Sequence, residues 1–130
     1  MKLLDYTAET SFLPRLECPD RTEVIRRLVD GLVQAGAVSS PEQLVEEILR
    51  RESEGSTAIG GGLTIPHTRY AEASRVQFAV ATLTTPLDIP SEDDQPVDVV
   101  ILIVGPRGDP RQMLRILARL ARLVKHDEFL

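Results

Sequence analysis

The sequence has few aromatic residues: they account for 4% of its 130 residues, and tryptophan is absent. Hydrophobic residues still make up 42% and charged residues 27%, which is typical of a globular domain and not of a disordered chain. The core must therefore be aliphatic. Because a chain of this length buries enough surface to fold without cross-links, we predict one domain over residues 1–130. The abrupt ending at Phe129-Leu130 leads us to expect a native chain that is longer at its C-terminus.

Cysteine and long apolar runs are also scarce. Cys18 is the only cysteine, so no internal disulfide can form, and a reducing cytoplasm is the expected location. The longest apolar run, over residues 99–104, is far too short to span a bilayer, and the N-terminus has no signal-peptide core. We therefore predict no membrane insertion. Two histidines and one cysteine, widely spaced, form no metal-ligand pattern.

Basic residues are outnumbered by acidic ones, 15 to 20, which gives a net charge of −5. Nucleic acid is not an expected partner, because binding to a phosphate backbone needs clustered lysine and arginine. The motifs of nucleotide hydrolysis are missing too: there is no Walker A lysine, and the glycine run at 60–62 does not open onto a helix. Protein partners and small ligands remain open.

Start and stop signals for helices are clear. Asp20 precedes an apolar stripe of helical period, and Gly36 follows it, which predicts a helix over about 21–35. A proline at the first helical position opens a second helix over 41–54. A third helix is predicted over about 110–125, with arginines along its solvent side.

Two stretches are typical of strands, at 76–83 and 97–104. The second is almost wholly apolar, as in a strand that is covered on both faces. Helices on either side of such a strand predict an α/β fold: a mixed β-sheet flanked by helices on both faces, which is a three-layer α/β/α sandwich.

The most unusual stretch is 56–69, in which three consecutive glycines are followed by Pro66 and His67. For the glycines alone, a hairpin turn is the preferred interpretation; the alternative is a loop whose N–H groups approach a ligand. Proline fixes the backbone just before the histidine and so helps to hold its ring in one direction. A neutral imidazole nitrogen can attack phosphorus and give a phosphoramidate, which passes its phosphoryl group onward.

Such a transfer needs positive charge near the phosphoryl oxygens, and Arg51 is the candidate. Helical spacing places Arg51 on nearly the same side as Leu44 and Ile48, at the inner edge of the apolar face, whereas Arg50 points outward. An inward guanidinium near a glycine loop is one interpretation, and it indicates a site that binds an anion. A salt bridge, or a stem that returns the charge to water, explains the position equally well.

The residues around the histidine resemble a known active-site signature. Arg51-Glu52, followed by STAIGGGLTIPH over 56–67, is similar to the signature of the enzyme IIA domains of the mannitol/fructose class. These domains, which include the nitrogen-regulatory enzyme IIA proteins, belong to the bacterial phosphoenolpyruvate-dependent sugar phosphotransferase system. The resemblance extends over most of the chain, from the early helix to the last one.

This resemblance implies a role for each site residue. His67 would accept a phosphoryl group from the phosphocarrier HPr, or from its nitrogen-branch counterpart, and pass it to an enzyme IIB domain. Arg51 would steady that group, and no metal or organic cofactor is needed. The implied phosphate pocket consists of Ser56, Thr57, Gly61 and Gly62.

One departure from the family concerns Met113. The family usually carries a second histidine just before the Leu-x-x-Leu-Ala pattern of the last helix, and a methionine offers no donor or charge to a phosphoryl oxygen. Two functions therefore stay open. The first is a working sugar-branch phosphocarrier; the second is a nitrogen-branch-type regulatory module, whose protein partners sense the phosphorylation state of His67 and which transfers weakly or not at all.

Overall fold

The structure is a computed structural model, which describes residues 2–18, 20–36, 38–55, 58–70, 73, 75–89, 95–108 and 110–124. These residues form three α-helices and six strands, with two short 3₁₀ turns near the N-terminus. In chain order they are η1 (Leu3–Tyr6), η2 (Glu9–Ser11), β1 (Phe12–Leu16), α1 (Arg21–Gln34), α2 (Pro41–Glu54), β2 (Ala58–Gly60), β3 (Leu63–Thr64), β4 (His67–Arg69), β5 (Gln77–Leu87), β6 (Val97–Gly105) and α3 (Pro110–Val124).

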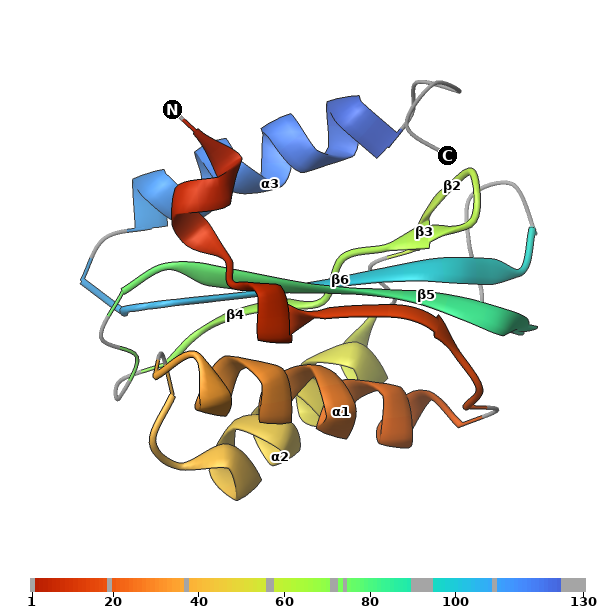
Figure 1. Cartoon of the computed structure of the whole chain (residues 1–130), viewed down its shortest axis with the longest axis horizontal. Coiled ribbons are helices and arrows are strands. Elements are labelled where there is room, and N and C mark those ends of the chain that lie inside the picture. Colours follow the sequence, from red (N-terminus) through yellow and green to blue (C-terminus); the bar gives the residue numbers. More distant parts are fainter. Residues whose placement is uncertain are drawn as a thin grey trace.

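The elements form three layers (Figure 1). Helices α1 and α2 cover one face of the sheet, and α3 lies across the other face, where η1 packs beside it. The side chain of Gln112 in α3 donates a hydrogen bond of 2.9 Å to the hydroxyl of Tyr6 in η1. The predicted three-layer sandwich with helices on both faces is confirmed.

The sheet is mixed. Its strand order is β1-β5-β6-β3-β2, and β4 pairs with β6 beyond the end of β3. Strands β3 and β4 run parallel to β6, β5 runs antiparallel to it, and β1 is parallel to β5. Strand β6 is thus the common neighbour that positions the segment 58–70.

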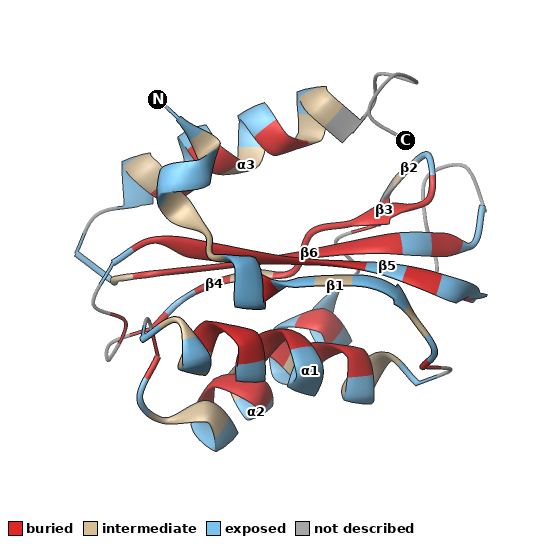
Figure 2. Cartoon of the chain, viewed as in Figure 1, coloured by how far each residue is buried: buried red, intermediate tan, exposed pale blue. Residues whose placement is uncertain are grey.

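Alternate residues of β6 point to the two halves of the core, because successive side chains of a strand leave opposite faces. Those that pack with α1 and α2 are Val100, Leu102 and Val104. Those that pack with α3 are Val99, Ile101 and Ile103. This double burial, seen in Figure 2 as the red stretch of β6 that follows the exposed Asp98, explains why the stretch is almost wholly apolar.

The helices begin and end where the sequence signals predict, within one residue. The carboxylate of Asp20 accepts a hydrogen bond of 2.9 Å from the backbone N–H of Thr22 at the start of α1. Gly36 has φ of +78°, a left-handed conformation that ends a helix without the steric penalty of a Cβ. Among the described residues, no helix is both long and apolar enough to cross a membrane.

Strand β1 was not predicted, because its sequence has no alternating pattern. Pro14 cannot donate a ladder hydrogen bond, and Arg15 has φ of +54°, so the register with β5 shifts between Leu13 and Leu16. Strand β5 also extends to Leu87, beyond the predicted end at residue 83; residues 84–86 of this extension are exposed and Leu87 is buried. Cys18 is free and buried.

Candidate functional site

His67 begins the short strand β4, and its backbone is fixed by β6. His67 pairs with Ile103, and the carbonyl of the preceding Pro66 accepts a hydrogen bond of 3.0 Å from the N–H of Ile103. The peptide bonds of the described residues are trans. The proline step therefore leads into a hydrogen-bonded strand, and the histidine has little backbone freedom.

The imidazole ring is held by the backbone of its own segment. Its Nδ1 lies 2.8 Å from the carbonyl oxygen of Ile65, and a carbonyl oxygen can only accept, so Nδ1 carries the proton and donates it. In this neutral tautomer the lone pair is on Nε2. The side chain of His67 is half-buried, which leaves part of the ring accessible to a reactant.

The strand register also fixes the face from which His67 emerges. Paired residues of neighbouring strands point to the same side of a sheet. Ile103 belongs to the α3 half of the core, as does Ile65, two residues before the histidine. His67 therefore leaves the sheet on the α3 face, whereas Thr68 is buried against the opposite face.

Tyr70 joins the end of β4 to the start of α2. Its N–H donates to the carbonyl of Gly105 at 2.8 Å, and its hydroxyl donates to the carbonyl of Ser40 at 3.0 Å. The ring is buried among the residues under α1 and α2. Sequence reasoning missed both this anchor and the carbonyl of Ile65, because each depends on tertiary contacts that no motif encodes.

The glycines form the turn between β2 and β3, which confirms the hairpin interpretation. Gly61 and Gly62 have φ of +65° and +82°, as a two-residue hairpin turn requires. A Cβ on Gly62 would lie 2.6 Å from Oδ1 of Asp98, so this position has no room for a side chain. The carbonyl of Gly62 accepts a hydrogen bond from the N–H of Asp98 in β6, whereas His67 pairs with Ile103, five residues further along that strand. At the usual rise of a strand, these two points of β6 are about 16 Å apart. The structure does not bring these two glycines to the histidine, and we assign them to the turn.

Arg51 lies in the last turn of α2, but not in the buried row. The buried residues of that helix are Leu44, Val45, Ile48 and Glu52. Arg51 is exposed, so its predicted place at the inner edge of the apolar face is corrected. The row follows Val45 and Ile48 to Glu52, and Arg51 lies on its flank at the helix end. As predicted, Arg50 is exposed, and it lies 3.8 Å from carboxylates of both Glu47 and Glu54.

Helix α2 contacts β4, so the helix that carries Arg51 lies beside the strand that carries His67. The two residues nevertheless belong to different layers: His67 points to the α3 face, and α2 covers the other face. Ser56 and Thr57, the other predicted pocket residues, lie outside the described residues.

Met113 is buried in the first turn of α3, on the face from which His67 emerges. A Cβ added to Gly105 would lie 2.8 Å from Cε of Met113, so the thioether fills the space above that glycine. Gly105 is paired with Arg69, two residues after the histidine. The predicted description of Met113 as a space-filling residue without a donor agrees with its apolar surroundings.

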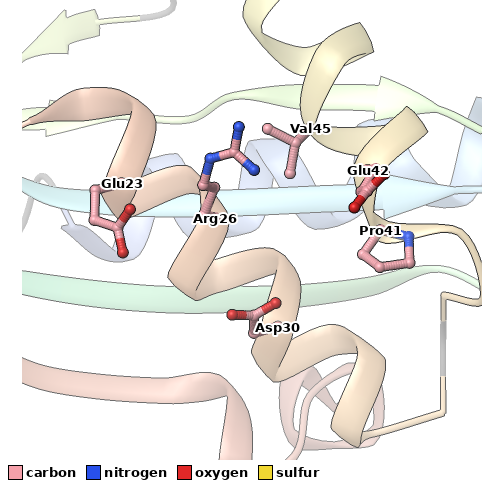
Figure 3. A pocket seen from close by; sticks show the side chains of 6 residues that line it. All are labelled: Glu23, Arg26, Asp30, Pro41, Glu42 and Val45. Carbon is pink, nitrogen blue, oxygen red and sulfur yellow. The ribbon is translucent and has the colours of Figure 1, made fainter.

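A hollow of the surface lies elsewhere, between α1 and α2. Charged side chains dominate its lining: Glu23, Arg26, Asp30, Pro41, Glu42 and Val45 (Figure 3). None of the predicted site residues is among them. In the part of the chain that the structure describes, no group of three His, Cys, Asp or Glu side chains could hold a metal ion.

Comparison with known proteins gives the same family for almost the whole chain. Residues 6–130 match the family described as phosphoenolpyruvate-dependent sugar phosphotransferase system, EIIA 2. A nitrogen regulatory protein of Bradyrhizobium diazoefficiens is 31% identical over 128 residues, which are 98% of this chain and 83% of that protein. The 2-O-alpha-mannosyl-D-glycerate-specific EIIABC component of Escherichia coli is 35% identical over 130 residues; the match covers 98% of this chain but 20% of that protein.

Solved structures share the fold. The nitrogen regulatory protein IIA-Ntr from Neisseria meningitidis superposes with a TM-score of 0.86 at 21% identity, over 95% of this chain and 84% of that one. Enzyme IIA mannitol of Escherichia coli, in its complex with phosphorylated enzyme IIB mannitol, gives a TM-score of 0.76 at 18% identity, over 93% of this chain and 83% of that one. This chain belongs to the EIIA 2 family of the phosphoenolpyruvate-dependent sugar phosphotransferase system, whose members are phosphotransferase components.

Proposed function

We propose that this member of the EIIA 2 family is a phosphoryl carrier, which receives a phosphoryl group on Nε2 of His67 from HPr or from its nitrogen-branch counterpart. One observation carries the proposal: the Nδ1–H of His67 is committed to the carbonyl of Ile65 at 2.8 Å. This bond selects the tautomer whose lone pair is on the other ring nitrogen. The expected location is the cytoplasm.

The proposed step is a substitution at phosphorus. The lone pair of Nε2 forms a bond to phosphorus, and the bond between phosphorus and the donor atom breaks, so that its electron pair leaves with the donor. The imidazole keeps its proton on Nδ1 and becomes positively charged. The carbonyl dipole of Ile65 stabilises that charge as it develops, which lowers the barrier without a separate base.

Arg51 is the first cation proposed for the phosphoryl oxygens. Its exposed position in the last turn of α2 leaves the guanidinium free to approach the edge of β4, which α2 contacts. Among the described residues β4 pairs with β6 alone, so no further strand separates the two layers there. Ser56 and Thr57 remain predicted pocket residues, and the proposal does not depend on them.

Onward transfer to an enzyme IIB domain is the expected next step in a sugar-branch protein. Met113 favours a second function, because a buried thioether offers no hydrogen-bond donor where a transferring phosphoryl group would gain from one. In that case the domain is a regulatory module. Phosphorylation of His67 adds about two negative charges, which are enough to make or break a protein contact.

Reconstitution tests the proposal. The chain is incubated with phosphoenolpyruvate, enzyme I and HPr, and in parallel with the nitrogen-branch donor pair. We expect acid-labile label on the wild type and none on His67→Gln; label that persists in the variant would show a different acceptor. Adding a cognate enzyme IIB then separates the two functions, since a sugar-branch carrier loses its label and a regulatory module keeps it.

A further inference from the structure

We propose that Arg69 is a second cation of the site, whose guanidinium contacts the phosphoryl oxygens on His67. The inference rests on the proposed function and adds to it a residue that the family signature does not include. Its starting point is the strand register: His67 pairs with Ile103, and Arg69 pairs with Gly105. Residues two apart in a strand leave the same face, with Cα atoms about 6.6 Å apart.

The strand partner of Arg69 is Gly105, which has no side chain, so no side chain of β6 stands directly beside that of Arg69 on this face. The space above Gly105 is filled by the methyl group of Met113 and by Cγ2 of Val76, which would lie 2.8 and 3.1 Å from a Cβ there. Both residues are buried and apolar. These neighbours offer Arg69 no polar partner at its base, and a charged group avoids such contacts unless it is paired.

Nothing in the described part of the chain occupies the guanidinium. Arg69 is exposed, and its side chain makes no ion pair and no hydrogen bond with residues that the structure describes. The nearby Arg107, by contrast, lies 3.4 Å from the carboxylate of Glu47. Arg69 therefore has a long, charged side chain without a described partner, on the same face as His67 and two residues from it. Such a side chain is suited to bind an incoming anion.

The two arginines would then act from different layers. Arg51 approaches from α2 on one side of the sheet, and Arg69 stands on the α3 side with His67. Since Met113 offers no donor beside Gly105, Arg69 supplies the positive charge on that side. A phosphoryl group on Nε2 would lie between the two guanidinium groups.

The test uses two phosphoryl donors, because a protein donor reports on docking as well as on chemistry. Wild type, Arg69→Ala, Arg69→Lys and Arg119→Ala are labelled by phospho-HPr and, separately, by phosphoramidate. In the second reaction Nε2 bonds to phosphorus, the P–N bond of phosphoramidate breaks, and the nitrogen leaves as ammonia. Arg119→Ala is the matched control, since it removes the same charge from an exposed position of α3.

We expect Arg69→Ala to slow labelling about tenfold with both donors, Arg69→Lys to recover part of the rate, and Arg119→Ala to react like wild type. A second readout is the ³¹P titration of the phosphohistidine. A nearby cation favours the more highly charged phosphoryl form, so Arg69→Ala should raise the midpoint pH of that titration.

An unchanged rate with phosphoramidate and an unchanged ³¹P midpoint would overturn the inference. So would a defect confined to phospho-HPr, because it would mean that Arg69 contacts the donor protein and not the phosphoryl group. Failure of the proposed carrier function has a different signature. Wild type would then accept no label from HPr or its nitrogen-branch counterpart, while labelling by phosphoramidate would still report on Arg69.

Discussion

The two faces of the sheet are covered in different ways. Two helices seal one face, with a continuous aliphatic core that includes Leu28, Leu44 and Leu102, all fully buried. In the part of the chain that the structure describes, the other face is covered by one α-helix, α3, together with the turn η1, and exposed side chains such as Leu114 stand on the outer side of α3. His67 emerges on this second face and is half-buried. The comparison indicates that the packing on the sealed face stabilises the strands, whereas the other face leaves the ring of His67 accessible to a reactant.

The largest effect that the comparison predicts is at His67. We expect His67→Gln to abolish labelling by phospho-HPr, a loss of at least about a thousandfold, because no other described group on that face is a neutral ring nitrogen. The free energy of unfolding should change little, since the ring is only half-buried and glutamine retains a donor for the carbonyl of Ile65. Acid-labile labelling and urea unfolding measure the two effects. A large loss of stability would show that His67 belongs to the core and not to an open face.

A substitution on the sealed face should have the opposite effect: it should lower stability and leave the labelling rate unchanged. Leu102→Ala removes a fully buried side chain and is expected to lower the free energy of unfolding by about 3 kcal/mol, through lost burial and the cavity left behind. Below the unfolding transition, the labelling rate per folded molecule should match that of wild type. Leu114→Ala is the control, since its side chain is 57% exposed, and a change within about 0.5 kcal/mol is expected. An equal decrease in the free energy of unfolding in the two variants would show that the two faces do not differ in how they stabilise the fold.

Arg51 tests whether the helical layer that covers the sealed face contributes to the chemistry. We expect Arg51→Ala to slow labelling about a hundredfold, because it removes one preorganised cation from the transferring group. Arg50→Ala is the matched control: it removes the neighbouring charge, which instead interacts with Glu47 and Glu54 on the solvent side. The measurement is the labelling rate of both variants, from reactions quenched at successive times. Equal rates for the two would remove Arg51 from the site and leave the cation on the α3 side alone.

Much of this arrangement could be predicted from the sequence, and the reasons are local. The helix limits follow from Asp20, Gly36 and Pro41, whose effects act within one turn of the chain. The buried strand β6 follows from its unbroken apolar run, and the position of His67 follows from its motif. Each of these signals is contained in a few neighbouring residues.

What could not be predicted depends on partners distant in the chain. Strand β1 exists because β5 pairs with it, although Pro14 and Arg15 are unfavourable to a regular strand. The face of His67 is set by its parallel register with Ile103, 36 positions away, and this register also separates the glycine turn from the ring. The helical spacing of Arg51 suggested an inward side chain, but the end of α2 leaves that flank exposed.

The smallest predicted effect concerns Met113, which packs between α3 and the face of the sheet that α3 covers. Met113→His places a ring donor above Gly105, on the face of His67, and we expect it to speed transfer to an enzyme IIB about threefold while labelling by phospho-HPr stays near the wild-type rate. Because position 113 is buried, the histidine should also lower the free energy of unfolding by about 1–2 kcal/mol. Met113→Leu separates the two consequences, since it keeps the apolar packing and adds no donor. The measurement is the decay of labelled protein after enzyme IIB is added. If Met113→His and Met113→Leu decay at the same rate, a donor at this position has no part in the transfer, and the thioether on this face serves packing alone.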